Sequence, residues 1–248
     1  MAFYIKEFFN NPAGKGSAIL NINATKSKFE EKYNIIHKKI THKSFFVKND
    51  VYILVNIPSS VEGIMYDVLL KFEKNKKSLG TTILDMEMKI FSNSPSFLYT
   101  YANAYSAQKL LIKECKKKLS NKMLSDIAKT RNPYGMLSYD FSVYSALHYV
   151  LSNGYTNIDD LKMTGSIKCD LSTVLRFVKD ADALQKTRKI QKDYNKMMEQ
   201  EKLKKNKNKA IKGNSEKDNH DPSLKEVKNV KNTVHIKKSK ISKKVKKV

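Results

Sequence analysis

The chain has 248 residues and a formal net charge of +24, with 40% hydrophobic and 29% charged residues. This length allows one large domain or two small ones with a buried core. The two cysteines, Cys115 and Cys169, are too few for a disulfide framework or a cysteine-based zinc site. No stretch approaches the ~18 apolar residues of a membrane-spanning helix, and the start "MAFYIKEFF" lacks the pattern of a signal peptide. We therefore expect a soluble protein of a reducing compartment that makes no membrane contact.

Lysine supplies almost all of the positive charge. Only three of the 48 basic residues are arginines, namely Arg131, Arg176 and Arg188. A preference for Lys over Arg, together with many Asn and Ile residues, is what codon drift in an AT-rich genome produces. The charge alone is therefore weak evidence for evolved nucleic-acid binding, although a surface this basic attracts polyanions.

The first 104 residues have the patterns of β-strands, with one helix inserted among them. The predicted strands lie within residues 16–25, 44–57 (two strands), 63–75, 81–94 and 96–105. The pair within 44–57 is expected to turn at Lys48-Asn49-Asp50, and Pro58 is expected to end its second strand. Apolar residues at helical spacing predict the inserted helix within 27–40, with Ser27 as its N-cap.

From residue 104 onward the pattern becomes helical. The predicted helices lie within residues 104–119, 121–129, 136–154, 156–165 and 171 to about 205. Gly154 is expected to follow the end of the third helix, and Asp170 to cap the last one. The apolar stripe of this last helix is strong through Leu184 and then thins, which predicts a projecting helix that is solvated or binds a partner.

The last part of the chain has a different composition. Residues 201–248 hold 17 lysines and five acidic residues, and they contain no aromatic residue. Such a segment cannot bury enough apolar surface to offset the entropy of ordering, so we expect residues 205–248 to be disordered. Its polycationic end predicts contacts with nucleic acid or acidic partners. The residues expected to make these contacts are Lys237, Lys238, Lys240, Lys243, Lys244, Lys246 and Lys247.

Together these patterns predict an α+β fold in three regions. Residues 1–104 form a β-rich region with one helix, and residues 105–204 form a helical region packed on it that ends in a long basic helix. Residues 205–248 form the lysine-rich tail. No period of 20 to 50 residues repeats along the chain, which argues against a solenoid.

The stretch "AGKGS", residues 13–17, is the nearest match to a nucleotide-binding loop. A P-loop has the pattern G-x-x-x-x-G-K-[ST] between a strand and a helix, because backbone N–H groups and a helix N-terminus bind the phosphate. Here the distal glycine is missing, and no strand precedes the motif. We therefore interpret Gly14 and Gly16 as turn residues.

An alternative interpretation is a Mg²⁺-dependent nuclease that resembles the PD-(D/E)xK superfamily. In such enzymes an Asp on one strand and a D/E-x-K motif on the next hold the metal and steady the attacked phosphate. Asp67, Glu87 and Lys89 have the right order and a suitable separation in the sequence. The same residues also fit the polar face of an ordinary half-exposed strand, and Tyr66 stands where the superfamily has its proline.

A second alternative is a protein that binds single-stranded nucleic acid in replication or regulation. Phe97, Tyr99 and Tyr101 alternate and would share one face of a strand, and aromatic side chains on such a face can stack on bases. An aromatic sheet face packed under a helix is the competing interpretation. It is favoured because no basic residue follows Tyr101 until Lys109.

The remaining reactive side chains show no catalytic arrangement. Cys115 lies on a predicted apolar stripe and is interpreted as a buried structural thiol. Cys169 precedes a capping residue at a helix start, which could lower its pKa, but a spare surface thiol is the favoured interpretation. His148 is interpreted as a core histidine, and no pair of histidines has the spacing of metal ligands.

Two stretches give the chain its overall texture: "LDMEMKIFSNSPSFLYTYANAY", residues 84–105, and "TRNPYGMLSYDFSVYSALHY", residues 130–149. Over residues 1–155 this texture resembles small structural and accessory proteins of phages with AT-rich genomes. The resemblance implies a role in a virion or in its assembly. It implies no site residue, because it includes no diagnostic motif.

The sequence thus predicts a non-catalytic structural or assembly protein, with no cofactor and no metal. Its expected partners are other protein subunits, in an oligomer or larger assembly, and nucleic acid at the basic tail. Its expected location is a virion, the host cytoplasm, or both.

Overall fold

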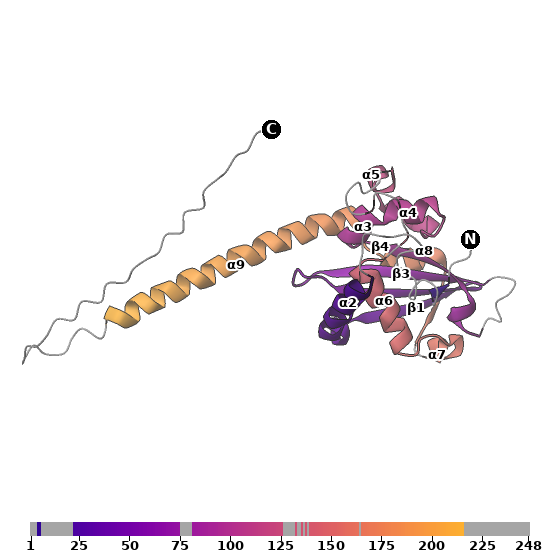
Figure 1. Ribbon diagram of the computed structural model, residues 1–248, viewed down its shortest axis with the longest axis horizontal. Helices are drawn as coiled ribbons and strands as arrows, with labels where there is room; N and C mark the ends of the chain where they lie inside the picture. Colours follow the sequence, from indigo (N-terminus) through magenta and orange to yellow (C-terminus); the bar gives the residue numbers. More distant parts are fainter. Residues whose placement is uncertain are drawn as a thin grey trace, which may run out of the picture. The chain divides into compact units, whose positions relative to one another are not determined.

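A computed structural model describes residues 4–5, 22–74, 81–125, 132, 135, 137, 139–163 and 165–215 of the chain. The chain divides into two units, Met1–Gln200 and Glu201–Val248. The fold of the first unit is α+β, as predicted, with a mixed β-sheet between helices (Figure 1). We call the described residues up to Asp180 the body.

In the described part of the chain, five strands form one sheet in the order β4-β3-β2-β1-β5. Their bounds are β1 Thr41–Val47, β2 Asp50–Pro58, β3 Met65–Glu73, β4 Glu87–Ser92 and β5 Ile167–Lys168. β1 to β4 pair antiparallel in sequence order, and β5 runs parallel to β1. The predicted turn at 48–50 and the end of β2 at Pro58 are confirmed, and Lys48 takes the positive φ of 56° that this tight connection requires.

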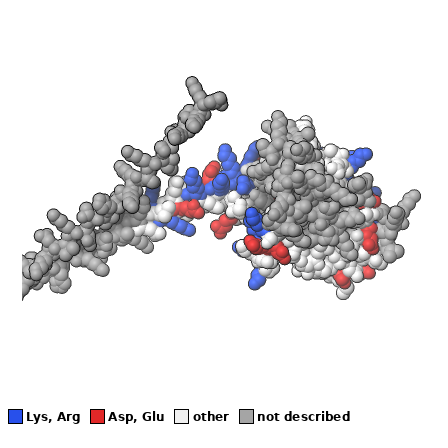
Figure 2. Space-filling model, viewed as in Figure 1, with Lys and Arg blue, Asp and Glu red and all other residues white. Residues whose placement is uncertain are grey.

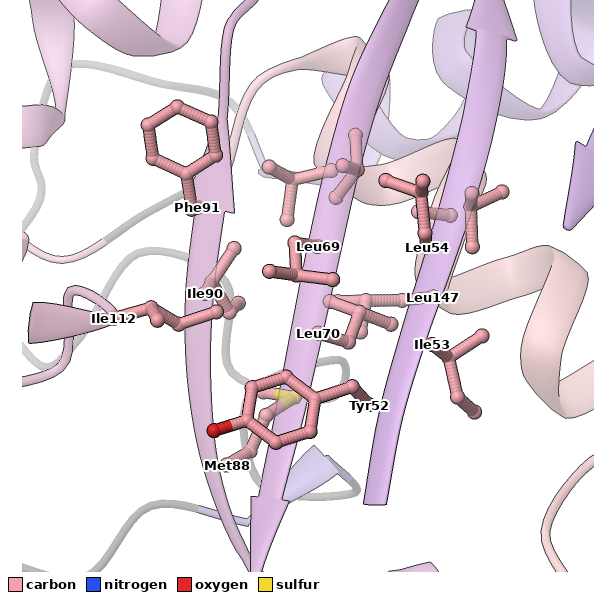
Figure 3. Close-up of a cluster of buried hydrophobic side chains, with 14 of the residues drawn as sticks. Tyr52, Ile53, Leu54, Leu69, Leu70, Met88, Ile90, Phe91, Ile112 and Leu147 are labelled. Atoms are coloured by element: carbon pink, nitrogen blue, oxygen red, sulfur yellow. The ribbon is translucent and has the colours of Figure 1, made fainter. Parts of the chain in front are cut away.

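Both faces of the sheet are covered, which explains the nearly continuous apolar runs of β2 and β3. Helix α6, Phe141–Ser152, packs on the face that holds Ile53 and Leu70, and Leu147 of this helix lies beside Leu70 (Figure 3). Helix α8, Leu171–Phe177, packs on the opposite face, where the ring of Phe177 lies 5.3 Å from that of Phe45. The core therefore lies on both sides of strands β2 and β3.

The first described helix begins earlier than the sequence predicts. α2 spans Ile22–Ile36, and the 3-10 helix η1, His37–Lys39, continues it. The strand predicted within 16–25 is therefore wrong from Ile22 onward, and Ser27 lies inside the helix instead of capping it. Aromatic packing favours the helix, since the ring of Phe29 lies 5.6 Å from that of Phe141. The "AGKGS" stretch lies outside the described residues.

The segment after β4 is helical, so the strand predicted within 96–105 is wrong. α3 spans Pro95–Thr100 and α4 spans Ala102–Ala107. Ser94 accepts a hydrogen bond from the N–H of Phe97, and proline at the first helical position suits a helix start. These two start signals outweigh the aromatic alternation that suggested a strand.

A single helix over 104–119 is also wrong. Lys109 has a positive φ of 61°, and the next residues pair with the edge of β4, where the N–H of Ile90 donates to Leu110. The 3-10 helix η3, Lys113–Lys118, follows. α5, Asn121–Ser125, lies within the next predicted helix, and α7, Ile158–Met163, lies within 156–165 as predicted.

The long C-terminal helix that the sequence predicts is two helices. α8 ends at Phe177, and α9 begins at Ala181 and ends at Ser215. Asp180 causes the new start, because its carboxylate accepts hydrogen bonds from the N–H groups of Asp182 and Ala183. The helix thus continues beyond residue 205, where the tail was predicted to begin, and residues 216–248 lie outside the described part.

Candidate polyanion-binding surface

Asp67, the first of the three predicted nuclease residues, is completely buried in the sheet. Its carboxylate accepts hydrogen bonds from the side-chain amides of Asn56 (2.8 Å) and Asn93 (3.2 Å). The backbone N–H of Lys179 donates a third, at 2.7 Å. These donors come from β2, from the end of β4 and from the junction between α8 and α9, so Asp67 joins three parts of the body.

The surroundings of Asp67 are those of a structural carboxylate. Burial raises its pKa, although the N–H donors and the charge of Lys179 oppose this rise. The side chain of Asn93 cannot turn round to offer its oxygen, because that oxygen already accepts the N–H of Asp67 at 2.8 Å. The network fixes the backbone at Lys179, where the chain enters α9.

Glu87 and Lys89 lie at the other end of the sheet. The register pairs Glu87 with Glu73, six residues along β3 from Asp67, which corresponds to about 20 Å. Lys89 forms an ion pair with Glu73 at 2.5 Å, and Lys71 bonds the same carboxylate at 2.6 Å. Burial acts to raise the pKa of Glu73, but the two lysines outweigh it and lower the pKa.

The structure therefore does not bring the three nuclease candidates together. Asp67 cannot share a metal ion with a carboxylate about 20 Å away. No group of three or more His, Cys, Asp or Glu residues within the described part is placed to hold a metal ion. At one end of the sheet, Asp67 and its three hydrogen-bond donors form a structural network, which we call the Asp67 clamp. At the other end, Lys71, Glu73 and Lys89 form a cluster of ion pairs.

A second buried carboxylate, Asp140, joins two helix starts. It caps α6 by accepting the N–H of Val143 at 3.0 Å, and the hydroxyl of Ser142 donates to it at 2.8 Å. Ser94, the cap of α3, donates its hydroxyl to the other oxygen of Asp140. Asp140 thus ties the chain after β4 to the helix that covers the sheet.

The aromatic platform predicted from Phe97, Tyr99 and Tyr101 is not formed. In the helical segment 95–107 the side chains of Phe97 and Tyr101 are four residues apart, and both are buried. Tyr99 is exposed on another side. One exposed ring cannot provide the stack of successive bases that the strand arrangement required.

The two thiols and His148 do not form a catalytic arrangement within the described residues. Cys115 is buried as predicted, and burial raises its pKa to about 12. Cys169 is half-buried, and burial together with the nearby Asp170 raises its pKa, so the lowered pKa that its helix-start position suggested is wrong. His148 is partly exposed, so the core position predicted for it is wrong, and its Nδ1 lies 2.9 Å from the hydroxyl of Ser152.

Helix α9 carries the largest group of free charges in the described part. Its first residues pack on the body, where Leu184 contacts a small cluster with Val61, Ile64 and Tyr66. Asp180 and the Asp67 clamp hold this start in place. Beyond it, basic side chains gather along the helix (Figure 2). The exposed lysines up to residue 206 are Lys186, Lys189, Lys192, Lys196, Lys202, Lys204 and Lys205.

Three of these lysines form a continuous stripe. At about 100° per residue, Lys189, Lys192 and Lys196 lie within about 60° of one another around the helix axis. None of the three forms an ion pair with a described residue. We call them the lysine stripe. Such a row of unpaired cations can bind a row of anions such as phosphates.

The seven tail lysines predicted to bind nucleic acid, from Lys237 to Lys247, lie outside the described residues. The residues that sequence reasoning missed are Asn56, Asn93, Ser94, Asp140 and Lys179. Ser94 and Asp140 had a detectable signal, since each precedes a helix start. The clamp around Asp67 had none, because its members are separated by up to 112 residues.

Comparison with protein-family models, with curated proteins and with solved structures finds no match to the chain. Function therefore has to be argued from the chain itself. None of the helices in the described part is long and apolar enough to cross a membrane.

Proposed function

We propose that the protein is a non-catalytic assembly protein that binds nucleic acid through α9 and the basic segment that follows it. The observation that carries the proposal is the lysine stripe: three exposed lysines on one helix, without ion-pair partners among the described residues. In the sequence the stripe is followed by residues 201–248, which hold 17 lysines.

The distribution of charge within the molecule supports this proposal. Lysines of the sheet such as Lys71 and Lys89 are paired with carboxylates, whereas those of the stripe have no ion-pair partner among the described residues. Unpaired surface lysines bind phosphates by releasing condensed counterions, without reading sequence. We therefore expect binding that depends steeply on salt and little on base sequence.

The surroundings of the two buried carboxylates, Asp67 and Asp140, support the part of the proposal that says the protein is non-catalytic. Asp67 and Asp140 are buried and hold helix starts and strand ends in place. The carboxylate oxygens of both residues are occupied by hydrogen bonds inside the protein, whereas a catalytic carboxylate must be able to reach its substrate. A role in a virion, which the phage-like texture implies, stays a prediction.

The direct test compares the full chain with a chain that ends at Ser215 and so keeps all of α9. Duplex DNA of random sequence is titrated with each protein by fluorescence anisotropy at several salt concentrations. We expect the shortened chain to bind more weakly and with a shallower salt slope, because it has fewer lysines to neutralise phosphates. The DNA affinity that the shortened chain retains measures the contribution of α9 to binding.

Two results would contradict the proposal. One is a full chain that does not bind DNA at 50 mM salt. The other is cleavage of plasmid DNA by the purified protein with Mg²⁺ or Mn²⁺, where Asp67→Asn abolishes the cleavage. Glu87→Gln is the matched variant for that assay, because Glu87 lies at the opposite end of the sheet.

A further inference from the structure

One side of α9 exposes large apolar side chains that no described residue covers. Ile190 is 70% exposed, Tyr194 is 50% exposed and Met197 is 52% exposed. They are spaced by four and three residues, so they lie on one side of the helix. We call them the apolar stripe. Most of the neighbouring side chains on α9 are polar or charged, so this stripe is a local exception.

The apolar stripe does not face the body. The side that packs on the body holds Ala181, Leu184 and Gln191, and Gln191 contacts the loop at Gly63. At about 100° per residue the apolar stripe lies about 120° away from this side. Burial against the protein's own sheet and helices therefore cannot account for it.

The spacing of the stripe matches a helix–helix seam. Extended toward the start of α9, it includes Ala183 and Thr187, which gives steps of four, three, four and three residues. This repeat of 3.5 residues keeps one side of a helix against a partner helix over four turns. A partner helix of matching length would remove the three exposed side chains from water, which is favourable.

We propose that the partner is α9 of a second copy of the chain, packed antiparallel and centred on Ile190. In this arrangement Ala183 lies opposite Met197 of the second copy, and Thr187 lies near its Tyr194. On either side of the central Ile190 pair a smaller residue thus faces a larger one, which is the way helices fill a seam without overlap.

Charge selects the antiparallel direction. Beside the seam lie Lys186 and Asp193, seven residues apart and on the same flank. In a parallel pair this flank of one copy lies across the seam from the other flank of the second copy, so Lys186 and Asp193 would not meet each other. The antiparallel pair centred on Ile190 places Lys186 beside Asp193 twice, once on each side of the symmetry axis, so only this direction gains the two attractions.

The pairing leaves the lysine stripe accessible, because that stripe lies about 130° from the apolar stripe around the helix. The inference rests on the assembly role proposed above and names one of its protein contacts. Its test uses no nucleic acid, so a failure here and a failure of DNA binding are separate results.

The experiment is disulfide crosslinking of single cysteines in a Cys169→Ser background, with the buried Cys115 retained. Ile190→Cys is expected to crosslink to itself on mild oxidation, because it lies at the centre of the seam. Met197→Cys alone is not, since the two copies of residue 197 are 14 residues apart along the seam, about 21 Å. Met197→Cys mixed with Ala183→Cys is expected to crosslink.

A charge exchange provides the control for specificity. In the chain without added cysteines, Lys186→Glu or Asp193→Lys alone should weaken dimerisation about threefold to tenfold, measured by sedimentation. The double variant should restore it, because the pair is remade with reversed sign. Circular dichroism of each variant checks that α9 still forms.

Three results would overturn the inference. The first is a monomeric wild-type chain at ~100 μM. The second is self-crosslinking of Met197→Cys as efficient as that of Ile190→Cys, which indicates a parallel pair. The third is loss of dimer in the double variant as severe as in the single ones, which indicates a seam without the Lys186–Asp193 contact.

Discussion

The buried carboxylates of the body and the lysines of α9 are charged groups in opposite environments. In the body, Asp67 and Asp140 are buried, and each accepts hydrogen bonds from three different residues. On α9, the lysine stripe is exposed and has no ion-pair partner in the described part of the chain. The difference teaches where function is to be sought: the buried carboxylates of the body hold the fold together, whereas the lysine stripe of α9 is available to bind a partner.

The largest difference between the body and α9 is expected for the same apolar substitution made in each of them. Leu70 is fully buried in β3, and Leu203 of α9 is 61% exposed. Leu70→Ala should lower the free energy of unfolding by about 2–5 kcal/mol, because it leaves a cavity in the core. Leu203→Ala should change it by less than about 0.5 kcal/mol. Urea unfolding followed by circular dichroism measures both, and equal reductions would contradict the division.

A smaller effect is expected at the buried carboxylates, and it should differ between them. Asp67→Asn should cost about 2–3 kcal/mol, because the new NH₂ group faces fixed donors such as the N–H of Lys179. Asp140→Asn should cost under about 1.5 kcal/mol, since the hydroxyls of Ser94 and Ser142 can reverse and accept.

Urea unfolding again gives the measurement, and the order of the two reductions in stability is the result that matters. Asn also keeps the oxygen that caps α6. A larger reduction for Asp140→Asn than for Asp67→Asn would show that the clamp at Lys179 contributes less to the fold than the pair of helix caps.

The smallest predicted effect is a dependence of stability on pH. Burial raises the pKa of Asp140 in the folded state, although its hydrogen bonds oppose the rise. The folded protein therefore holds this proton more tightly than the unfolded chain. The resulting stability is complete below the unfolded pKa of ~3.9 and is lost as the pH rises through the folded value.

Asp170, the cap of α8, provides the matched control. Hydrogen bonds from Thr173 lower its pKa, so its contribution is present at neutral pH and is lost as the pH falls. The difference in free energy of unfolding between wild type and Asp140→Asn should shrink from acid to neutral pH. The difference between wild type and Asp170→Asn should grow, and the same trend in both would contradict the assignment.

Parts of the fold that depend on neighbours in sequence could be predicted. The β1–β2 hairpin, the end of β2 at Pro58 and the cap at Asp170 each rest on a few adjacent residues, and all three are confirmed. The segment 95–107 resembles a strand in sequence because its aromatic residues alternate. Ser94 and Pro95 carry the stronger signal, since they fix the backbone at a helix start.

The candidate site was harder to predict, because its members are far apart in sequence. The sequence pattern makes Asp67 a candidate metal ligand, yet its partners Asn56, Asn93 and Lys179 come from separate elements. Pairing register decides the matter: Glu87 belongs beside Glu73 and not beside Asp67. Helical spacing does predict a solvated or partner-binding helix after Leu184, although it does not predict the break at Asp180.

The central claim is that the lysines of α9 bind polyanion together with the basic segment that follows the helix, and that total charge alone does not account for the binding. It is tested by the salt dependence of DNA binding for the triple variant Lys189→Gln, Lys192→Gln, Lys196→Gln. The control changes three exposed lysines of the body, Lys28, Lys38 and Lys39, to Gln, which alters the net charge equally.

We predict that the α9 variant binds more weakly and that the slope of log K against log salt falls by about 0.9 for each phosphate that the helix no longer neutralises. The control should bind nearly as the wild type does. An equal fall in affinity in the two variants would contradict the claim, because DNA would then be responding to bulk charge alone.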